Sequence, residues 1–214
     1  MKPELSIILP SIRPDRLEKL YDSILTSAER TFELIIVGPY PLPEKLSELK
    51  NVKYVKDFGS PVRASNIAAS LCEGEVYTWF ADDCILFENS LDKCLDEYRA
   101  MGTDNKNVLV AKYYEGQEGS TERETLQPDS YFRVNGTPAG SPHLPDDWWL
   151  FNVAIMHRSF FDSLGAWDCS FEHQHDEPLL QSKFRGPNWS TNVNPRLKID
   201  NWKSAPAVWG RRFK

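Results

Sequence analysis

Short apolar runs alternate with segments of helical periodicity along residues 1–100, and this alternation restricts the folds open to the chain. The expected strands cover residues 5–9, 33–37, 52–55 and 76–80. The expected helices begin near Pro14, cover residues 62–71, and follow a cap at Asn89 or Ser90. Strands that alternate with helices predict a mostly parallel, doubly wound α/β sheet flanked by helices.

Residues 101–214 are less regular. A strand is expected over 108–113, an apolar run covers 151–156, and a helix is expected over about 159–164. Residues 115–128 and 135–147 read as long loops, and the tail from residue 188 has no clear periodicity. We therefore expect a single domain over residues 1–214.

Composition and charge exclude several classes of protein. The net charge of −6 argues against a nucleic-acid partner, because phosphate backbones are bound by clustered Lys and Arg. No apolar run reaches the ~18 residues of a membrane span, and the N-terminus does not resemble a signal peptide. The four cysteines lack zinc-like spacing. These features favour the cytoplasm.

Polar residues stand where the expected strands end, at residues 10–13, 38–40, 57–60 and 81–84. Ligands of doubly wound sheets bind beyond these carboxyl ends, so the four segments should share one crevice. Within it, the adjacent carboxylates of Asp82 and Asp83 repel each other. A Mg²⁺ or Mn²⁺ ion would offset the repulsion and link the carboxylates to substrate phosphates. A solvated turn is the competing interpretation.

Three segments, in this order and spacing, resemble the family 2 glycosyltransferases of the GT-A type. They are LSIILPSIR at 5–13, RASNIA at 63–68 continued by GEVYTWFADD at 74–83, and LGAWD at 164–168 followed by Asp176 and Glu177. The resemblance implies a GT-A (Rossmann-like) fold, with residues 1–100 binding the nucleotide sugar and residues 101–214 the acceptor. It also implies inverting transfer of a sugar from a nucleoside diphosphate sugar, with UDP-sugar favoured, to a hydroxyl of a glycan or glycoprotein.

The resemblance assigns nucleotide-sugar contacts to eight residues: Pro10, Ser11, Arg13, Gly38, Asp57, Arg63, Asn66 and Asp82. It assigns the metal to Asp83, with the roles of Asp82 and Asp83 open to exchange. Asn66 is equally open to a structural role against the acidic loop. The chain departs from the family's Asp-x-Asp pattern at Ala81 and Cys84. It also has Gly38 where the family often has Asp, which leaves the choice of base open.

The second half supplies candidates for the acceptor side. The resemblance makes Asp176 the first candidate for the general base and Glu177 the second, and an acidic helix start before Pro178 is the alternative. Asp147, Trp148 and Trp149 are expected to bind the acceptor, because aromatic rings stack on sugars and carboxylates accept from hydroxyl groups. The basic segment 209–213 is either solvated or folds over the diphosphate.

Two other functions compete with sugar transfer. A catalytically decayed nucleotide-sugar or carbohydrate-binding module would bind its ligand without metal and turn nothing over. A sugar-phosphate nucleotidyltransferase would need a glycine-rich loop after the first strand, and residues 10–16 contain no glycine. The chain is either complete or a piece of a longer multidomain polypeptide.

Overall fold

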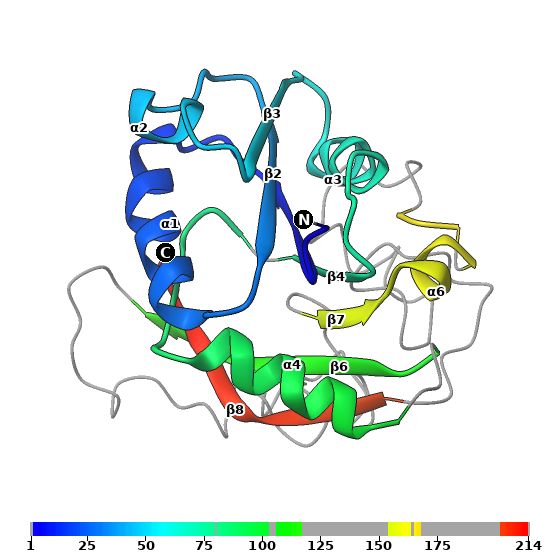
Figure 1. The fold of residues 1–214 in the computed structure, drawn as a ribbon. Coiled ribbons are helices and arrows are strands. Elements are labelled where there is room, and N and C mark those ends of the chain that lie inside the picture. The colour runs from blue at the N-terminus through cyan, green and yellow to red at the C-terminus, as the bar shows by residue number, and fades with distance from the viewer. Residues whose placement is uncertain are drawn as a thin grey trace, which may run out of the picture.

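The computed structural model describes residues 2–79, 81–102, 106–116, 154–163, 165–167 and 202–213. In these ranges, helices flank both faces of an eight-stranded sheet with the order β3-β2-β1-β4-β7-β6-β8-β5 (Figure 1). The strands are β1 (Leu5–Pro10), β2 (Phe32–Gly38), β3 (Val52–Lys56), β4 (Val76–Trp79), β5 (Cys84–Leu86), β6 (Val108–Gly116), β7 (Ala154–His157) and β8 (Trp202–Phe213). The helices are η1 (Pro14–Arg16), α1 (Leu17–Ser27), α2 (Glu44–Ser47), α3 (Pro61–Ser70), α4 (Ser90–Ala100) and α6 (Arg158–Ser163).

The first four strands form a parallel unit with β1 at its centre. β1 pairs with β2 on one side and with β4 on the other, and β3 lies beyond β2. Helices α1 and α3 therefore lie on opposite faces of this unit (Figure 1). The strand order reverses between β1 and β4, which is where doubly wound sheets bind their ligands.

Each face of the sheet carries its own hydrophobic cluster. Leu5, Ile7 and Leu9 point toward α1 and α4, whereas Ile8 points toward α3. Successive side chains of a strand alternate between faces, so a strand covered on both sides is apolar throughout. This burial explains why β1 and β2 appear in the sequence as continuous apolar runs.

The expected strands and helices of residues 1–100 are confirmed, with small differences at individual residues. Leu25 of α1 is exposed, although it follows the buried Ile24 and Tyr21 at helical spacing from the latter. Leu71, the last residue of the helix expected over 62–71, is the C-cap of α3 and is also exposed. Asn89 is the N-cap of α4, but its backbone is left-handed and its side chain makes no capping hydrogen bond.

The second half completes the sheet in a way that the sequence did not indicate. β7 joins the parallel unit by pairing antiparallel with β4, and β6 pairs antiparallel with β7. The tail showed no clear periodicity in the sequence, yet its residues Trp202–Phe213 form β8 between β6 and β5. The basic segment is thus part of a sheet strand, and Arg212 lies opposite Cys84. No helix in the described ranges is long and apolar enough to cross a bilayer.

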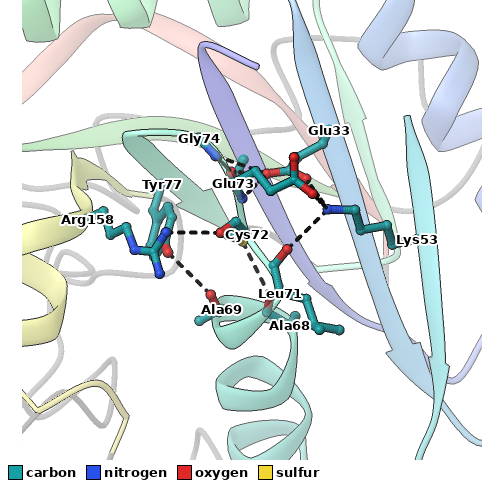
Figure 2. Close-up of polar contacts among 11 residues, drawn as sticks. Glu33, Lys53, Ala68, Ala69, Leu71, Cys72, Glu73, Gly74, Tyr77 and Arg158 are labelled. Carbon is teal, nitrogen blue, oxygen red and sulfur yellow. Dashed lines mark hydrogen bonds and ion pairs between the residues drawn. The ribbon is translucent and has the colours of Figure 1, made fainter. Parts of the chain in front are cut away.

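A polar cluster at the amino end of the parallel strands holds the loop that leads into β4 (Figure 2). The buried Glu33 carboxylate accepts hydrogen bonds from the Ser6 hydroxyl at 2.6 Å, the Gly74 amide at 3.1 Å and the Lys53 ammonium at 3.0 Å. Lys53 also donates to the Leu71 carbonyl at 3.2 Å. These bonds connect β1, β2 and β3 to the end of α3, so the cluster is structural.

Burial raises the pKa of Glu33, but the hydrogen bonds from Ser6, the amides of Glu73 and Gly74, and Lys53 outweigh it and lower the pKa below its usual value. A carboxyl whose pKa is lower in the folded protein stabilises the fold above its unfolded pKa. That contribution is lost as the pH falls through the lowered folded value.

We expect Glu33→Gln to lower the free energy of unfolding by about 1.5–3 kcal/mol at neutral pH, because hydrogen bonds to a charged group are lost. Urea unfolding should show the difference from wild type shrinking as the pH falls below ~4.3, the usual Glu pKa. Glu48→Gln, at an exposed position, is the control and should match wild type. An unchanged stability of Glu33→Gln at neutral pH would contradict the structural role.

Candidate functional site

Two buried carboxylates lie immediately beyond the carboxyl end of β4. The side chains of Asp82 and Asp83 are 6% and 3% exposed. Asp82 and Asp83 therefore do not form the solvated turn that competed with a functional interpretation. Buried charges of like sign are costly unless donors or cations surround them, so their partners determine what the site can do.

Asp82 is bound by the loop that follows β1. Its Oδ2 accepts from the Ser11 hydroxyl at 3.0 Å, the Ile12 amide at 2.9 Å and the Arg13 amide at 3.0 Å. Hydrogen bonds from several backbone and hydroxyl donors offset part of the cost of burying a carboxylate. Asp82 thus joins the ends of β1 and β4 across the point where the strand order reverses.

Arg13 bridges both carboxylates with one nitrogen. Its Nη1 lies 2.7 Å from Asp82 Oδ1 and 3.1 Å from Asp83 Oδ2. Pro14 follows at the start of η1, and the Arg16 amide donates to the Arg13 carbonyl at 3.1 Å, which holds the backbone of this loop. The family resemblance assigned Arg13 to contacts with the nucleotide sugar. It did not predict that Arg13 pairs with the acidic residues.

Gly38 connects the same loop to the end of β2. The Ser11 amide donates to the Val37 carbonyl at 2.9 Å. A Cβ added at Gly38 would lie 1.8 Å from the Ser11 carbonyl oxygen, which is an impossible contact. A side chain such as the family's Asp therefore has no room here while Ser11 keeps its place. The Gly38 carbonyl accepts from the Asp57 amide at 3.1 Å, which extends the contacts to β3.

Asp57 and Arg63 form an ion pair between the end of β3 and the first turn of α3. Arg63 Nε lies 3.1 Å from Asp57 Oδ1, and the Gly59 amide donates to Asp57 Oδ2 at 2.8 Å. Ser60 caps the helix by accepting from the Arg63 amide at 3.2 Å. The Asp57 side chain is mostly buried, while that of Arg63 is 63% exposed.

These contacts join all four strand ends that the sequence predicted to share a site. We call the set the strand-end cluster: Ser11, Arg13, Gly38, Asp57, Arg63, Asp82 and Asp83. Pro10, the last residue of β1, is half-buried and lies opposite Val37. The roles that the resemblance assigns to these residues toward a ligand stay predictions.

Asn66 binds a segment from the second half of the chain. Its Nδ2 donates to the Trp167 carbonyl at 2.8 Å, and the Trp167 amide donates to its Oδ1 at 3.1 Å. The backbone of Gly165 and Ala166 is left-handed, with φ of 82° and 56°. These bonds give Asn66 a structural role in holding Trp167, and its expected role against the acidic loop stays a prediction.

Three large apolar side chains at the strand ends were not singled out from the sequence. Ile12, Tyr40 and Phe58 follow β1, β2 and β3, and they are 62%, 55% and 78% exposed. The signal in the sequence was a large apolar residue within a polar loop directly after a strand. Beside the cluster, a groove of about 760 Å³ runs from Pro14 to Pro41, and its carboxylates, among them Asp15 and Glu18, make it unsuitable for a diphosphate.

The acidic pair fits a hard divalent cation only in part. Within the described ranges, no three His, Cys, Asp or Glu side chains gather to hold a metal. Carboxylate oxygens are the ligands that Mg²⁺ and Mn²⁺ prefer, and one or two of them suffice when phosphates supply the rest. Asp82 Oδ2 accepts three protein donors, and Asp83 is the candidate ligand.

The acceptor-side candidates lie outside the described residues. They are Asp147, Trp148, Trp149, Asp176 and Glu177. Their assignments therefore stay predictions from the sequence.

Known structures share this fold, although no protein family and no curated protein matches the chain. S. aureus TarS 1-349 matches with a TM-score of 0.64 at 14% identity, covering 98% of this chain and 60% of that one. The same protein in complex with UDP-GlcNAc gives a TM-score of 0.63 at 15% identity, over 99% of this chain and 58% of that one. Its complex with UDP gives a TM-score of 0.62 at 14% identity, over 99% of this chain and 60% of that one. The chain thus spans about 60% of the length of these structures. The likeness confirms the expected GT-A fold.

We expect Gly38→Ala to destabilise the protein by about 3 kcal/mol, because the added methyl group overlaps a backbone oxygen that must move. Gly59→Ala is the matched control. Its Cβ would meet side-chain atoms of Arg63 and Asp57, which can rotate away, so the cost should be about 1 kcal/mol or less. Urea unfolding compares the two variants. Equal stabilities would show that the Ser11 loop is not held against Gly38.

Proposed function

We propose that this GT-A domain transfers a sugar from a nucleoside diphosphate sugar, with a UDP-sugar favoured, to a hydroxyl of a glycan or glycoprotein. The observation that carries the proposal is the strand-end cluster. It places a buried acidic pair, bridged by a guanidinium, where the strand order reverses between β1 and β4. Doubly wound sheets bind nucleotides at this position.

The similar structures support the nucleotide part of the proposal. TarS has been solved in complex with UDP and with UDP-GlcNAc, and it shares the fold over nearly the whole of this chain. The exposed rings of Tyr40 and Phe58 add apolar surface at the ends of β2 and β3, which suits stacking on a base. The transferred sugar and the acceptor are separate questions.

Positive groups of the cluster suit a diphosphate. Arg63 is exposed in the first turn of α3, where the amides of the helix also favour an anion. Arg13 is 39% exposed, and a guanidinium binds phosphate oxygens in pairs. Asp83 would hold Mn²⁺ or Mg²⁺, which when bound neutralises the charge that develops on the leaving diphosphate.

The acceptor chemistry belongs to residues outside the described ranges. A sugar hydroxyl needs a general base, and Asp176 is our candidate, with Glu177 as the second. Asp147, Trp148 and Trp149 would bind the acceptor sugar. Direct attack of the activated hydroxyl on the anomeric carbon inverts its configuration, as the family resemblance implies.

One observation keeps a binding module as the second candidate. Ala81 and Cys84 flank the acidic pair, so one Asp of the Asp-x-Asp pattern is missing, and Arg13 already lies against the pair. A decayed module of this kind would bind a nucleotide sugar without metal and would not cleave it.

We expect Asp83→Asn to weaken the Mn²⁺-dependent binding of UDP by about 100-fold or more, because loss of outer-shell partners alone costs about 10- to 100-fold. Calorimetric titration of UDP and GDP, with and without Mn²⁺, measures this effect and identifies the base. Asp22→Asn is the control, because Asp22 pairs with Lys45 on the surface of α1. UDP binding that ignores both the metal and Asp83→Asn would refute the metal site and favour the decayed module.

We expect Asp176→Asn to lower the rate of sugar transfer by about 10²- to 10⁴-fold, the usual contribution of a general base. Donor binding should stay unchanged, because the base acts on the acceptor. Glu177→Gln is the paired variant and should lose less than about 10-fold. Turnover assays with a UDP-sugar and isothermal titration of UDP separate the two effects. A larger loss of activity in Glu177→Gln than in Asp176→Asn would assign the base to Glu177. Full activity in both variants would show that neither residue is the general base.

A further inference from the structure

The geometry points to Arg13 as a built-in counter-cation that controls when metal binds. We propose that its guanidinium screens Asp83 in the free protein, so that Mn²⁺ or Mg²⁺ binds weakly alone and tightly only together with the donor's diphosphate. The inference rests on the proposed function and deepens it, since it names the residue that couples the metal to the nucleotide.

The position of one nitrogen carries the first step. Arg13 Nη1 lies 2.7 Å from Asp82 Oδ1 and 3.1 Å from Asp83 Oδ2, so a positive charge already stands between the two carboxylates. A divalent ion on Asp83 Oδ2 would face this charge at close range, and charges of like sign repel strongly where side chains are buried. Metal binding therefore requires the guanidinium to leave Asp83.

The two carboxylates hold Arg13 unequally. Asp82 is fixed by the Ser11 hydroxyl and by the amides of Ile12 and Arg13, and it makes the shorter contact with the guanidinium. The contact with Asp83 is the longer of the two. The loop itself can thus stay in place, held by bonds from its backbone, while the Arg13 side chain gives up Asp83.

The diphosphate supplies what the released guanidinium needs. It offers oxygens that can bind the metal and also accept hydrogen bonds from Arg13, whose side chain is 39% exposed. The negative charge of the two phosphates offsets the positive charges of both the metal ion and the guanidinium. The bound metal then raises the affinity for the diphosphate, and the bound diphosphate raises the affinity for the metal. By thermodynamic linkage, the two affinities rise by the same factor.

The test measures metal alone, without turnover. Wild type, Arg13→Gln and Arg13→Lys are each titrated with Mn²⁺, with and without UDP. Electron paramagnetic resonance measures the concentration of free Mn²⁺ at each step. Arg30→Gln is the matched control, because Arg30 is a partly exposed guanidinium paired with Asp92 and Asp96 away from the cluster. Thermal unfolding verifies that each variant is folded. If Arg13→Gln does not fold, Arg13→Lys is used for the comparison with wild type.

Without UDP, we expect Arg13→Gln to bind Mn²⁺ about 10-fold more tightly than wild type, with Arg13→Lys between them and Arg30→Gln unchanged. UDP should tighten Mn²⁺ binding by about 10-fold or more in wild type, and by much less in Arg13→Gln. Equal or weaker Mn²⁺ binding by the folded Arg13 variants would overturn the proposal.

The outcomes also separate this proposal from the proposed function. If Asp83→Asn abolishes Mn²⁺-dependent UDP binding but the Arg13 variants do not tighten Mn²⁺, the transferase site stands and the role of Arg13 falls. If no protein binds Mn²⁺ even with UDP present, both proposals fail.

Discussion

The carboxylate of Asp82 is the contact on which the carboxyl edge of the sheet depends. It accepts hydrogen bonds from Ser11, Ile12 and Arg13, and it is almost wholly buried. A buried charge is tolerated only when donors surround it, so the loop after β1 must keep the conformation that supplies them. That conformation in turn brings Arg13 against Asp83, and it sets the Ser11 carbonyl where only a glycine fits at the end of β2.

Buried carboxylates lie at both ends of the parallel strands, and they serve different purposes. At the amino end, Glu33 is satisfied by hydroxyl, amide and ammonium donors that tie the strands to the loop after α3 (Figure 2). At the carboxyl end, Asp82 and Asp83 share one guanidinium whose side chain remains partly exposed. The first arrangement stabilises the sheet. The second leaves a charged group free to change partners, and such a group suits the binding of a charged ligand.

Local patterns predicted the parallel unit, and pairings between distant segments escaped them. Periodicity revealed β1 to β4 because each strand is buried on both faces or ends at a clear turn. β8 (Trp202–Phe213) contains a proline and a glycine without alternation, and three-residue β5 (Cys84–Leu86) is too short for a pattern. The sequence located Arg13, Asp57 and Asp83 at one edge. It could not show that Arg13 bridges the acidic pair or that Asn66 holds Trp167, because side-chain pairing depends on tertiary geometry.

The central claim is that the edge between β1 and β4 binds a metal and a nucleoside diphosphate together at Asp83. The anomalous signal of Mn²⁺ in crystals grown with UDP tests it most directly. The account predicts one manganese peak in bonding contact with Asp83, with the diphosphate beside it and the Arg13 guanidinium turned from Asp83 to a phosphate oxygen. Nucleotide bound at another edge of the sheet, or a diphosphate at this edge with no manganese while Arg13 still bridges Asp82 and Asp83, would contradict it.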